Sequence, residues 1–159
     1  MNRSAQHVVC PHCDAVNRIP PDRPARQAKC GKCHRAVFEG KPVPVTARSF
    51  DRHRTRSDVP VVADFWAPWC GPCHAMAPAY ERAAAELEPD YRLLKVNTEE
   101  EPELAARYDI RSIPTMMVFA RGDPVARTAG AMTTSGIVAW VRAQGRERQP
   151  PRAAGAPAG

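Results

Sequence analysis

Apolar positions are concentrated in two adjoining segments near the middle of the chain. Residues 59–66 form an apolar run interrupted by Asp64, which predicts a strand buried on both faces of a sheet. Further along, Met76, Tyr80 and Leu87 recur at helical spacing and predict a helix with one buried face. The short segment between the two therefore lies where a buried strand ends and a helix begins.

Two more apolar segments predict further strands. Residues 91–97 form one, and residues 116–120 form the other. Gly122-Asp123 then predicts a hairpin turn into a strand over residues 124–128.

Helices are predicted around these strands. Residues 45–57 hold the first one. Thr98 and Glu101 are three residues apart and fit a capping box at the start of a short helix. Thr133 is expected to cap the last helix, whose buried stripe consists of Ile137, Trp140 and Val141.

Length and composition are those of one compact domain with a small module attached. The chain has 159 residues, and a hydrophobic content of 43% supports a real core. No stretch reaches the roughly 18 apolar residues that cross a bilayer, and the N-terminus shows no apolar signal core. These features predict a cytoplasmic protein without a membrane partner, and we expect it to be a monomer.

The net charge of +6 is unevenly distributed. Residues 1–58 carry twelve basic and five acidic side chains, whereas residues 59–145 carry eight basic and eleven acidic ones. A basic N-terminal module raises nucleic-acid binding as an alternative. Four thiolates around one zinc ion would lower that positive charge, so we expect no nucleic-acid partner.

Four of the six cysteines form two Cys-x-x-Cys pairs near the N-terminus. Sixteen residues separate Cys10 and Cys13 from Cys30 and Cys33. This is the spacing of a zinc ribbon, in which each tight knuckle turns two sulfurs toward one tetrahedral ion. Gly31 is expected to free the backbone for such a turn.

Alternatives to the zinc ribbon are two reducible disulfides or four free thiols. His12 and His34 offer nitrogen ligands, but four sulfurs complete the zinc shell, so both histidines are expected on the surface. A module of about 35 residues has too small a core to fold alone, and the metal would supply its folding energy. The role of the module is then either structural or that of a redox sensor that releases zinc when its thiols are oxidised.

Prolines and glycines mark the expected boundaries. Residues 40–44, Gly-Lys-Pro-Val-Pro, predict an extended linker because proline does not enter a sheet interior. From residue 146 on, Pro, Ala, Gly and Arg follow without periodicity. The expected organisation is a ribbon over residues 1–40, a domain over residues 41–145 and a disordered tail over residues 146–159.

The third cysteine pair, Cys70-Gly71-Pro72-Cys73, occupies the junction between the buried strand and the helix. A helix N-terminus favours a thiolate through its free N–H groups and its dipole, and the thiolate is the form that attacks disulfides. Cys70 is therefore predicted to be the nucleophile. Cys73, one turn along, then attacks the mixed disulfide and releases the reduced substrate, which leaves a redox-active Cys70–Cys73 disulfide.

Residues 69–73, Trp-Cys-Gly-Pro-Cys, resemble the active site of the thioredoxin family. Asp64, Lys95 and the segment 113–115, Ile-Pro-Thr, follow at that family's order and spacing, so the resemblance spans roughly residues 45–144. With the N-terminal cysteines, the chain is most similar to the zinc-ribbon-bearing second thioredoxins of bacteria. The resemblance implies an α/β thioredoxin fold, a central mixed β-sheet flanked by helices, preceded by a small zinc ribbon.

The resemblance implies roles for two charged residues. Asp64 would accept the proton of Cys73, directly or through water, because a carboxylate in a buried strand is either paired or raised in pKa. Lys95 would pair with Asp64 and restrain that pKa. The alternative for Asp64 is a structural aspartate at a strand end.

The resemblance also implies a substrate groove. Pro114 would be cis and face Cys70, and the backbone of Ile113 would pair with an extended substrate segment. The alternative is an ordinary turn proline. The expected substrate-binding rim consists of Trp66, Trp69, Gly71, Pro72, Ile113, Gly130 and Ala131.

Two residues of the predicted active-site helix need a separate interpretation. Pro78 lies inside the helix, where it predicts a structural kink. His74 departs from the basic residue common at its position in the family and is expected to be a solvated side chain.

General protein disulfide reduction is the function that the resemblance implies. The chain has no Gly-rich dinucleotide fingerprint, so the electrons are expected from NADPH through thioredoxin reductase, with one zinc ion and no bound organic cofactor. A disulfide oxidase or isomerase is the rival enzyme, disfavoured by Gly71-Pro72 where those families place a histidine. A zinc-stabilised binding module or chaperone is the rival from another class.

Overall fold

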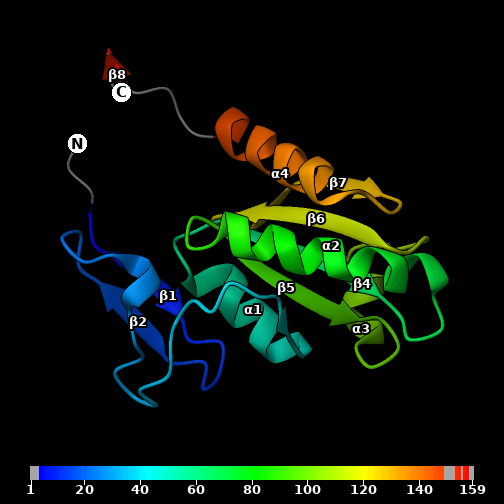
Figure 1. The fold of residues 1–159 in the computed structure, drawn as a ribbon, viewed down its shortest axis with the longest axis horizontal. Helices are drawn as coiled ribbons and strands as arrows, with labels where there is room; N and C mark the ends of the chain where they lie inside the picture. The colour runs from blue at the N-terminus through cyan, green and yellow to red at the C-terminus, as the bar shows by residue number, and fades with distance from the viewer. Residues whose placement is uncertain (1–3, 149–152, 155, 158–159) are drawn as a thin grey trace.

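The computed structural model describes residues 4–148, 153–154 and 156–157. Its centre is a five-stranded sheet in the order β3-β5-β4-β6-β7, flanked by helices (Figure 1). β3, β4 and β5 run parallel, and β6 and β7 are antiparallel to their neighbours. The strands are β3 Val43–Pro44, β4 Val61–Trp66, β5 Arg92–Asn97, β6 Thr115–Ala120 and β7 Asp123–Ala129. This mixed sheet confirms the expected fold class.

The helices cover the sheet in pairs. Helices α1 (Ala47–Arg56) and α3 (Pro102–Arg107) contribute to the core on one face, and α2 (Gly71–Leu87) and α4 (Thr134–Arg148) contribute to the core on the other. Each buries an apolar stripe because burial of apolar surface is the main favourable term in folding. Buried residues of the two cores include Phe50, Leu104 and Phe119 on the first face, and Met76, Tyr80, Ile137 and Val141 on the second.

β4 is the central strand and carries the apolar run of the sequence. Ala63 and Phe65 point into the core beneath α1, while Val62 points into the core beneath α2. Because side chains alternate along a strand, Asp64 shares the face of Val62 and lies on the side covered by α2. The predicted buried strand is confirmed: residues 61–65 are buried, and Trp66 at its end is half-buried.

The predicted hairpin is confirmed between β6 and β7. Its two-residue turn lies one residue earlier in the chain than expected. Its central residues are Arg121 and Gly122, both with positive φ (54° and 87°). Such paired positive φ angles match the twist of antiparallel strands. Thr133 caps α4 as predicted, since its hydroxyl accepts the Gly136 N–H at 3.1 Å.

The capping box predicted at Thr98 and Glu101 is wrong. Thr98 donates its hydroxyl to the last carbonyl of β4 at 3.0 Å, and Glu101 accepts the Ala47 N–H at 2.8 Å instead of capping its own helix. The capping box of the structure lies at the start of α1, between Thr46 and Ser49. Long-range contacts of these side chains override the local pattern.

The linker expected over residues 40–44 is wrong for its last two residues. Val43 and Pro44 form β3, the edge strand that pairs with β5. An edge strand tolerates proline because, on its open side, no neighbouring strand offers an acceptor for the missing N–H. The sheet of this domain therefore begins with a short edge strand.

The N-terminal ribbon, residues 4–40, consists of two short strands and two cysteine knuckles. Strand β1 (Gln6–Val9) pairs antiparallel with β2 (Val16–Ile19), followed by the 3-10 helix η1 (Ala25–Gln27) and a bridge between Lys29 and Ala36. The ribbon contacts the end of the sheet where β4 and β5 begin. The third cysteine pair lies at the start of α2, just after the other end of β4 (Figure 1). The two cysteine sites thus lie at opposite ends of the sheet.

Helix α4 extends past the boundary expected at residue 146. It ends at Arg148, so disorder over residues 146–148 is a wrong prediction. Two short strands, β8 (Ala153–Ala154) and β9 (Ala156–Pro157), pair in parallel. The rest of the predicted tail, residues 149–152, 155 and 158–159, falls outside the described residues. Among the residues that the structure describes, no helix is long and apolar enough to cross a membrane.

Candidate active site and metal site

Cys70 and Cys73 meet at the start of α2. Cys70 is the N-cap of the helix, and its sulfur accepts the Cys73 N–H at 3.2 Å. The two sulfurs form a disulfide, and the residues are only 4% and 3% exposed. Pro72 lies in the first helical turn, where its missing N–H costs nothing. A redox-active pair at a helix N-terminus is thus in place.

A proline loop faces Cys70. The Ile113–Pro114 peptide bond is cis, as is the Glu88–Pro89 bond elsewhere. The carbonyl oxygen of Ile113 lies 3.8 Å from Cys70 Sγ, and Gly130 donates its N–H to the Pro114 carbonyl at 2.9 Å. Within the described residues the Ile113 N–H has no backbone acceptor, so it is free to pair with an added strand.

The residues expected to form the substrate rim surround this pair. Trp69 is 69% exposed, and it is the one large apolar side chain among the described residues with such exposure. Trp66 and Ile113 pack against the buried Cys70 and Cys73. Gly71, Pro72, Gly130 and Ala131 are exposed. The surface at these residues is therefore apolar and broken by small side chains.

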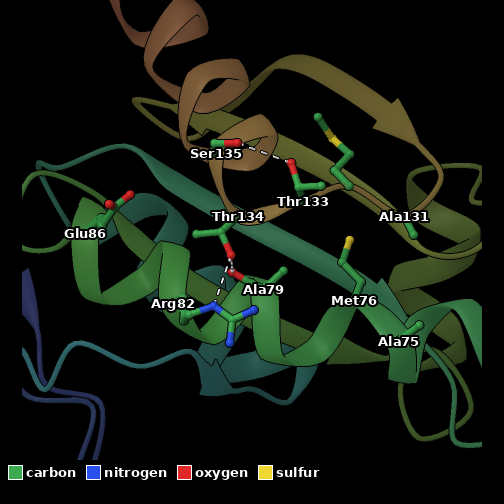
Figure 2. A pocket seen from close by; sticks show the side chains of 10 residues that line it. Ala75, Met76, Ala79, Arg82, Glu86, Ala131, Thr133, Thr134 and Ser135 are labelled. Carbon is green, nitrogen blue, oxygen red and sulfur yellow. Dashed lines mark hydrogen bonds between the residues drawn. The ribbon is translucent and has the colours of Figure 1, made fainter.

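A groove runs from Ala131 along the contact between α2 and α4. Its volume is about 720 Å³, and Figure 2 shows the residues that line it. Met76 and Ala79 form part of its α2 side, and Arg82 donates to the Thr134 hydroxyl at 3.3 Å. The groove thus adjoins the expected rim at Ala131.

Asp64 is buried without a partner for one carboxylate oxygen. The residue is 1% exposed, and its Oδ1 has no hydrogen bond within the described chain. Burial raises the pKa of Asp64 to about 7, and the positive charge of Lys95 opposes the rise. A carboxyl that titrates near neutral pH can accept a proton under physiological conditions.

Lys95 is the register partner of Asp64 on the neighbouring strand. No ion pair within 4.0 Å joins the two among the described residues; the ammonium lies 4.6 Å from the centre of the Trp66 ring. Lys95 therefore acts on Asp64 through space and also holds a rim tryptophan by a cation–π contact.

Three residues of α2 add to this description. His74 is exposed but not simply solvated, because its Nε2 lies 2.6 Å from the Pro68 carbonyl oxygen and its ring packs edge-on against Trp66. Pro78 lies inside the helix as expected. Tyr80, whose polar role the sequence did not reveal, donates its buried hydroxyl to the carbonyl oxygens of β4 and β5 at 3.3 Å and 2.8 Å.

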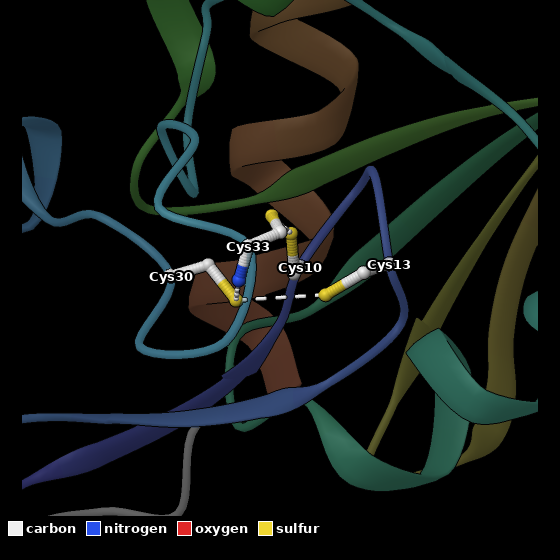
Figure 3. A group of neighbouring side chains, drawn as sticks. All are labelled: Cys10, Cys13, Cys30 and Cys33. Carbon is white, nitrogen blue, oxygen red and sulfur yellow. Dashed lines mark hydrogen bonds between the residues drawn. The ribbon is translucent and has the colours of Figure 1, made fainter.

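The four ribbon cysteines converge on one point. Figure 3 shows their side chains directed toward one another, and their sulfurs all lie within 4.8 Å of each other. The Cys10–Cys33 and Cys13–Cys30 sulfur pairs are each 3.6 Å apart. Four thiolates around an ion at about 2.3 Å in a tetrahedron would stand about 3.8 Å apart. The donor set and spacing therefore fit a tetrahedral metal ion.

Backbone N–H groups contact two of these sulfurs, those of Cys10 and Cys30. The sulfur of Cys30 accepts the Lys32 and Cys33 N–H groups at 3.4 Å and 3.5 Å, and that of Cys10 accepts the His12 N–H at 3.3 Å. For Cys30, burial raises the pKa, but these N–H groups and Asn17 outweigh it and lower the pKa overall. Burial raises the pKa of Cys10 to about 12 in spite of its N–H contact, so of these two sulfurs Cys30 is the one that favours the thiolate form.

Gly31 lies in the turn of the second knuckle as expected, but its φ angle is not positive. The positive φ angles of the two knuckles belong to Asp14 (65°) and His34 (69°), each directly after the second cysteine. Gly31 instead donates its N–H to the Asn17 side chain at 2.9 Å. His12 and His34 are exposed, and His12 Nε2 lies 3.0 Å from a carboxylate oxygen of Glu39. Neither histidine belongs to the sulfur cluster.

One buried pair of charges escaped the sequence analysis. Arg92 and Glu88 are 0% and 1% exposed, and Arg92 Nη1 donates to Glu88 Oε2 at 3.1 Å. The signal in the sequence is an arginine at the start of an otherwise apolar strand with a glutamate four residues before it. That signal is weak because such pairs usually lie on helix surfaces.

The fold and the paired thiols define a thiol–disulfide oxidoreductase with an added four-cysteine metal site. The Thioredoxin family model matches residues 41–143, and the model described as "Thioredoxin 2, N-terminal" matches residues 9–35. The chain belongs to the thioredoxin family.

Individual relatives agree with this assignment. Thioredoxin C-3 of Corynebacterium nephridii is 37% identical over 142 residues, which cover 89% of this chain and 97% of the relative. Thioredoxin 1 of Nostoc sp. is 48% identical over 88 residues, 55% of this chain and 82% of the relative. Among solved structures, a mutant thioredoxin from Halobacterium salinarum aligns with a TM-score of 0.61 at 29% identity, covering 67% of this chain and 93% of that one.

Proposed function

We propose that this thioredoxin reduces disulfides of client proteins through Cys70 and Cys73, is recycled by thioredoxin reductase at the expense of NADPH, and holds zinc in its ribbon. The observation that carries the proposal is the Cys70–Cys73 pair at the N-terminus of α2, opposite the cis Ile113–Pro114 loop. A reducing compartment such as the cytoplasm would maintain its working form.

The first half-reaction uses the Cys70 thiolate. A client segment adds along Ile113, where the free N–H and the nearby carbonyl offer strand-like pairing. The Cys70 sulfur attacks one client sulfur, a mixed disulfide forms, and the other client sulfur leaves as a thiolate. The N–H of Cys73 and the helix dipole stabilise the attacking sulfur before the reaction.

The second half-reaction uses Cys73. Asp64, whose pKa near 7 lets it accept a proton, receives the proton of the Cys73 thiol directly or through water. The resulting thiolate attacks the Cys70 sulfur, the Cys70–Cys73 disulfide forms, and the second client thiolate leaves. Two electrons pass to the client in total, and thioredoxin reductase returns two electrons to the pair.

Zinc is the ion that the ribbon sulfurs suit best, because a closed set of four thiolates in tetrahedral arrangement is typical of structural zinc sites. Cys10, Cys13, Cys30 and Cys33 would hold it. The ion would supply folding energy to a module whose own core is small.

Insulin reduction tests the proposal. Wild-type protein, NADPH and thioredoxin reductase should turn over insulin, Cys70→Ser should show no turnover, and Cys73→Ser should accumulate a mixed disulfide with insulin. The matched control is Ser112→Ala, an exposed residue outside the redox pair. Turnover that survives Cys70→Ser would refute the assignment and favour the binding-module interpretation.

A further inference from the structure

Arg92 is the largest fully buried side chain in the described part of the chain, and it joins the thioredoxin domain to the ribbon. Its Nη2 donates to the carbonyl oxygens of Val9 at 2.9 Å and Val37 at 2.8 Å, both in the ribbon. Its guanidinium also lies 4.6 Å from the centre of the Phe38 ring. One side chain of the sheet thus serves as hydrogen-bond donor to two separate ribbon segments.

The two ribbon acceptors are held in place by the cysteine knuckles. Val9 directly precedes Cys10, whose N–H donates to the Ala15 carbonyl at 2.8 Å and closes the first knuckle. Val37 follows the second knuckle, and its own N–H donates to Ala28 at 3.0 Å. The position of both carbonyls therefore depends on how the four sulfurs are arranged.

On the other side, Arg92 is tied to the end of α2. Its partner Glu88 is the C-cap of that helix, and Glu88 Oε1 accepts the Gly40 N–H at 2.9 Å, at the end of the ribbon. The Arg92 N–H donates to Pro60 at 2.9 Å, just before β4. Arg92 and Glu88 are thus a shared joint of α2, β5 and the ribbon.

We propose that Arg92 couples metal binding in the ribbon to the local stability of the thioredoxin domain where α2 ends and β5 begins. Metal loss releases the knuckles and withdraws the Val9 and Val37 carbonyls from the guanidinium. A buried charge that loses hydrogen bonds is costly, so the segment that holds Arg92 and Glu88 opens to water. Linkage makes the effect reciprocal: the joint strengthens metal binding by the same factor.

The coupling acts on stability and leaves the redox chemistry intact. Arg92 is paired with Val61 at the start of β4, and the active site follows Trp66 at its end, about 17 Å away along the strand. The proposal concerns occupancy of the metal site and does not require oxidation of its thiols. It also stands independently of the proposed client reaction.

Hydrogen exchange on the wild-type protein is the first test. The full chain is compared with one equivalent of zinc and after removal of zinc by a chelator under reducing conditions. Exchange at residues 84–94 should speed up by about tenfold or more without zinc, while residues 134–144 of α4 keep their protection. Equal exchange at residues 84–94 in both states, or an equal loss in α4, would overturn the proposal.

A variant that removes both buried charges is the second test. The double variant Arg92→Met/Glu88→Gln leaves no unpaired buried charge. Arg54→Met is the matched control, because Arg54 also donates to a carboxylate (Asp51) and to a carbonyl (Gly122) but does not contact the ribbon. The double variant should bind zinc 10- to 100-fold more weakly in chelator competition and lose the zinc dependence of exchange, as loss of an outer-shell partner of a metal site does. Wild-type zinc affinity in the double variant would contradict the proposal. If that variant does not fold, the wild-type comparison still decides.

Discussion

The cysteine pairs of the ribbon and the pair at the start of α2 share one spacing and have different backbone settings. In the ribbon, the residue after each second cysteine, Asp14 or His34, has a positive φ that turns the chain back. After Cys73 the chain continues as helix through α2. The sulfur of the first cysteine accepts backbone N–H groups in both settings, at Cys30 as at Cys70.

The difference shows that spacing brings two sulfurs together and the following chain decides what they do. A turned-back knuckle leaves its sulfurs free to meet a second knuckle, so four sulfurs converge on one point. A helical continuation places the pair against each other, and the helix N-terminus favours a thiolate at Cys70. One arrangement suits a metal and the other suits electron transfer.

Substitution of one cysteine in each site should have the largest effect and should separate the functions of the two sites most clearly. Cys70→Ser should lower insulin reduction about a thousandfold or more and leave the zinc content unchanged, because the nucleophile is lost and the ribbon is intact. Cys30→Ser should abolish stoichiometric zinc and unfold the ribbon, while kcat/KM stays within about twofold of wild type because the sites are distant. Zinc analysis and the coupled reductase assay are the measurements.

Two outcomes would contradict that separation. Zinc loss in Cys70→Ser would mean that the redox pair takes part in metal binding. Loss of reductase turnover in Cys30→Ser at a temperature where α2 and the sheet remain folded would mean that the ribbon contributes to the chemistry. Circular dichroism of each variant distinguishes unfolding from a chemical effect.

Asp64→Asn should have the next largest effect, and it acts in opposite directions on stability and rate. Burial raises the Asp64 pKa from 3.8 to about 7, so the folded protein holds a proton that the unfolded chain has released between these pH values. Stability therefore falls as pH rises through this window and is lowest above it. Removing the carboxyl should raise the free energy of unfolding at pH 8 by about 4 kcal/mol, and by little at pH 3.

The rate of disulfide reduction should fall in the same variant. Without a proton acceptor for Cys73, we expect at least about a tenfold loss near pH 7 and a flatter pH profile. Urea unfolding at pH 3 and pH 8 measures the first effect, and insulin reduction from pH 6 to 9 measures the second. An unchanged rate across that range would remove Asp64 from the mechanism.

Strong local patterns made most of the fold predictable. The apolar run of β4, the helical spacing after Cys73 and the hairpin at Gly122 each specify an element with little help from distant residues. The misplaced features depend on tertiary contacts: Glu101 serves the N–H of Ala47, and Pro44 is tolerated because β3 is an edge strand. Local sequence carries no information on either partner.

The site was predictable to the extent that its residues form recognisable spacings. The cysteine pairs and Pro114 could be predicted from the sequence, because the residues next to them in the chain belong to the same recognisable motif. The joint of Arg92 and Glu88 does not, since its acceptors are carbonyl oxygens of Val9 and Val37, and a backbone carbonyl leaves no mark in a sequence. The same holds for the contact between Lys95 and Trp66.

Lys95→Met should produce a smaller change that remains specific to the redox site. The positive charge of Lys95 lowers the Asp64 pKa against the effect of burial, so its loss should raise that pKa above 7. The rate at pH 7 should drop a few-fold and recover at higher pH, and Lys95→Arg should restore the wild-type profile. A rate loss that is equal at every pH would assign the effect to the Trp66 contact instead.

The glycines that follow Cys30 and Cys70 should give the smallest effect, and they sharpen the comparison of the two sites. Neither has a positive φ; a Cβ on Gly31 would meet Asn17 Oδ1 at an ordinary 3.9 Å, and one on Gly71 would meet nothing within 4 Å. Gly31→Ala and Gly71→Ala should each change the free energy of unfolding by no more than about 0.5 kcal/mol. Gly130→Ala, at a φ of 103°, should cost clearly more in the same thermal denaturation series. A large loss of stability in Gly31→Ala alone would show that this glycine shapes the knuckle. Small losses in both variants would mean that the glycines do not distinguish the two sites. The residue after the second cysteine would then be the one that separates a metal knuckle from a redox helix.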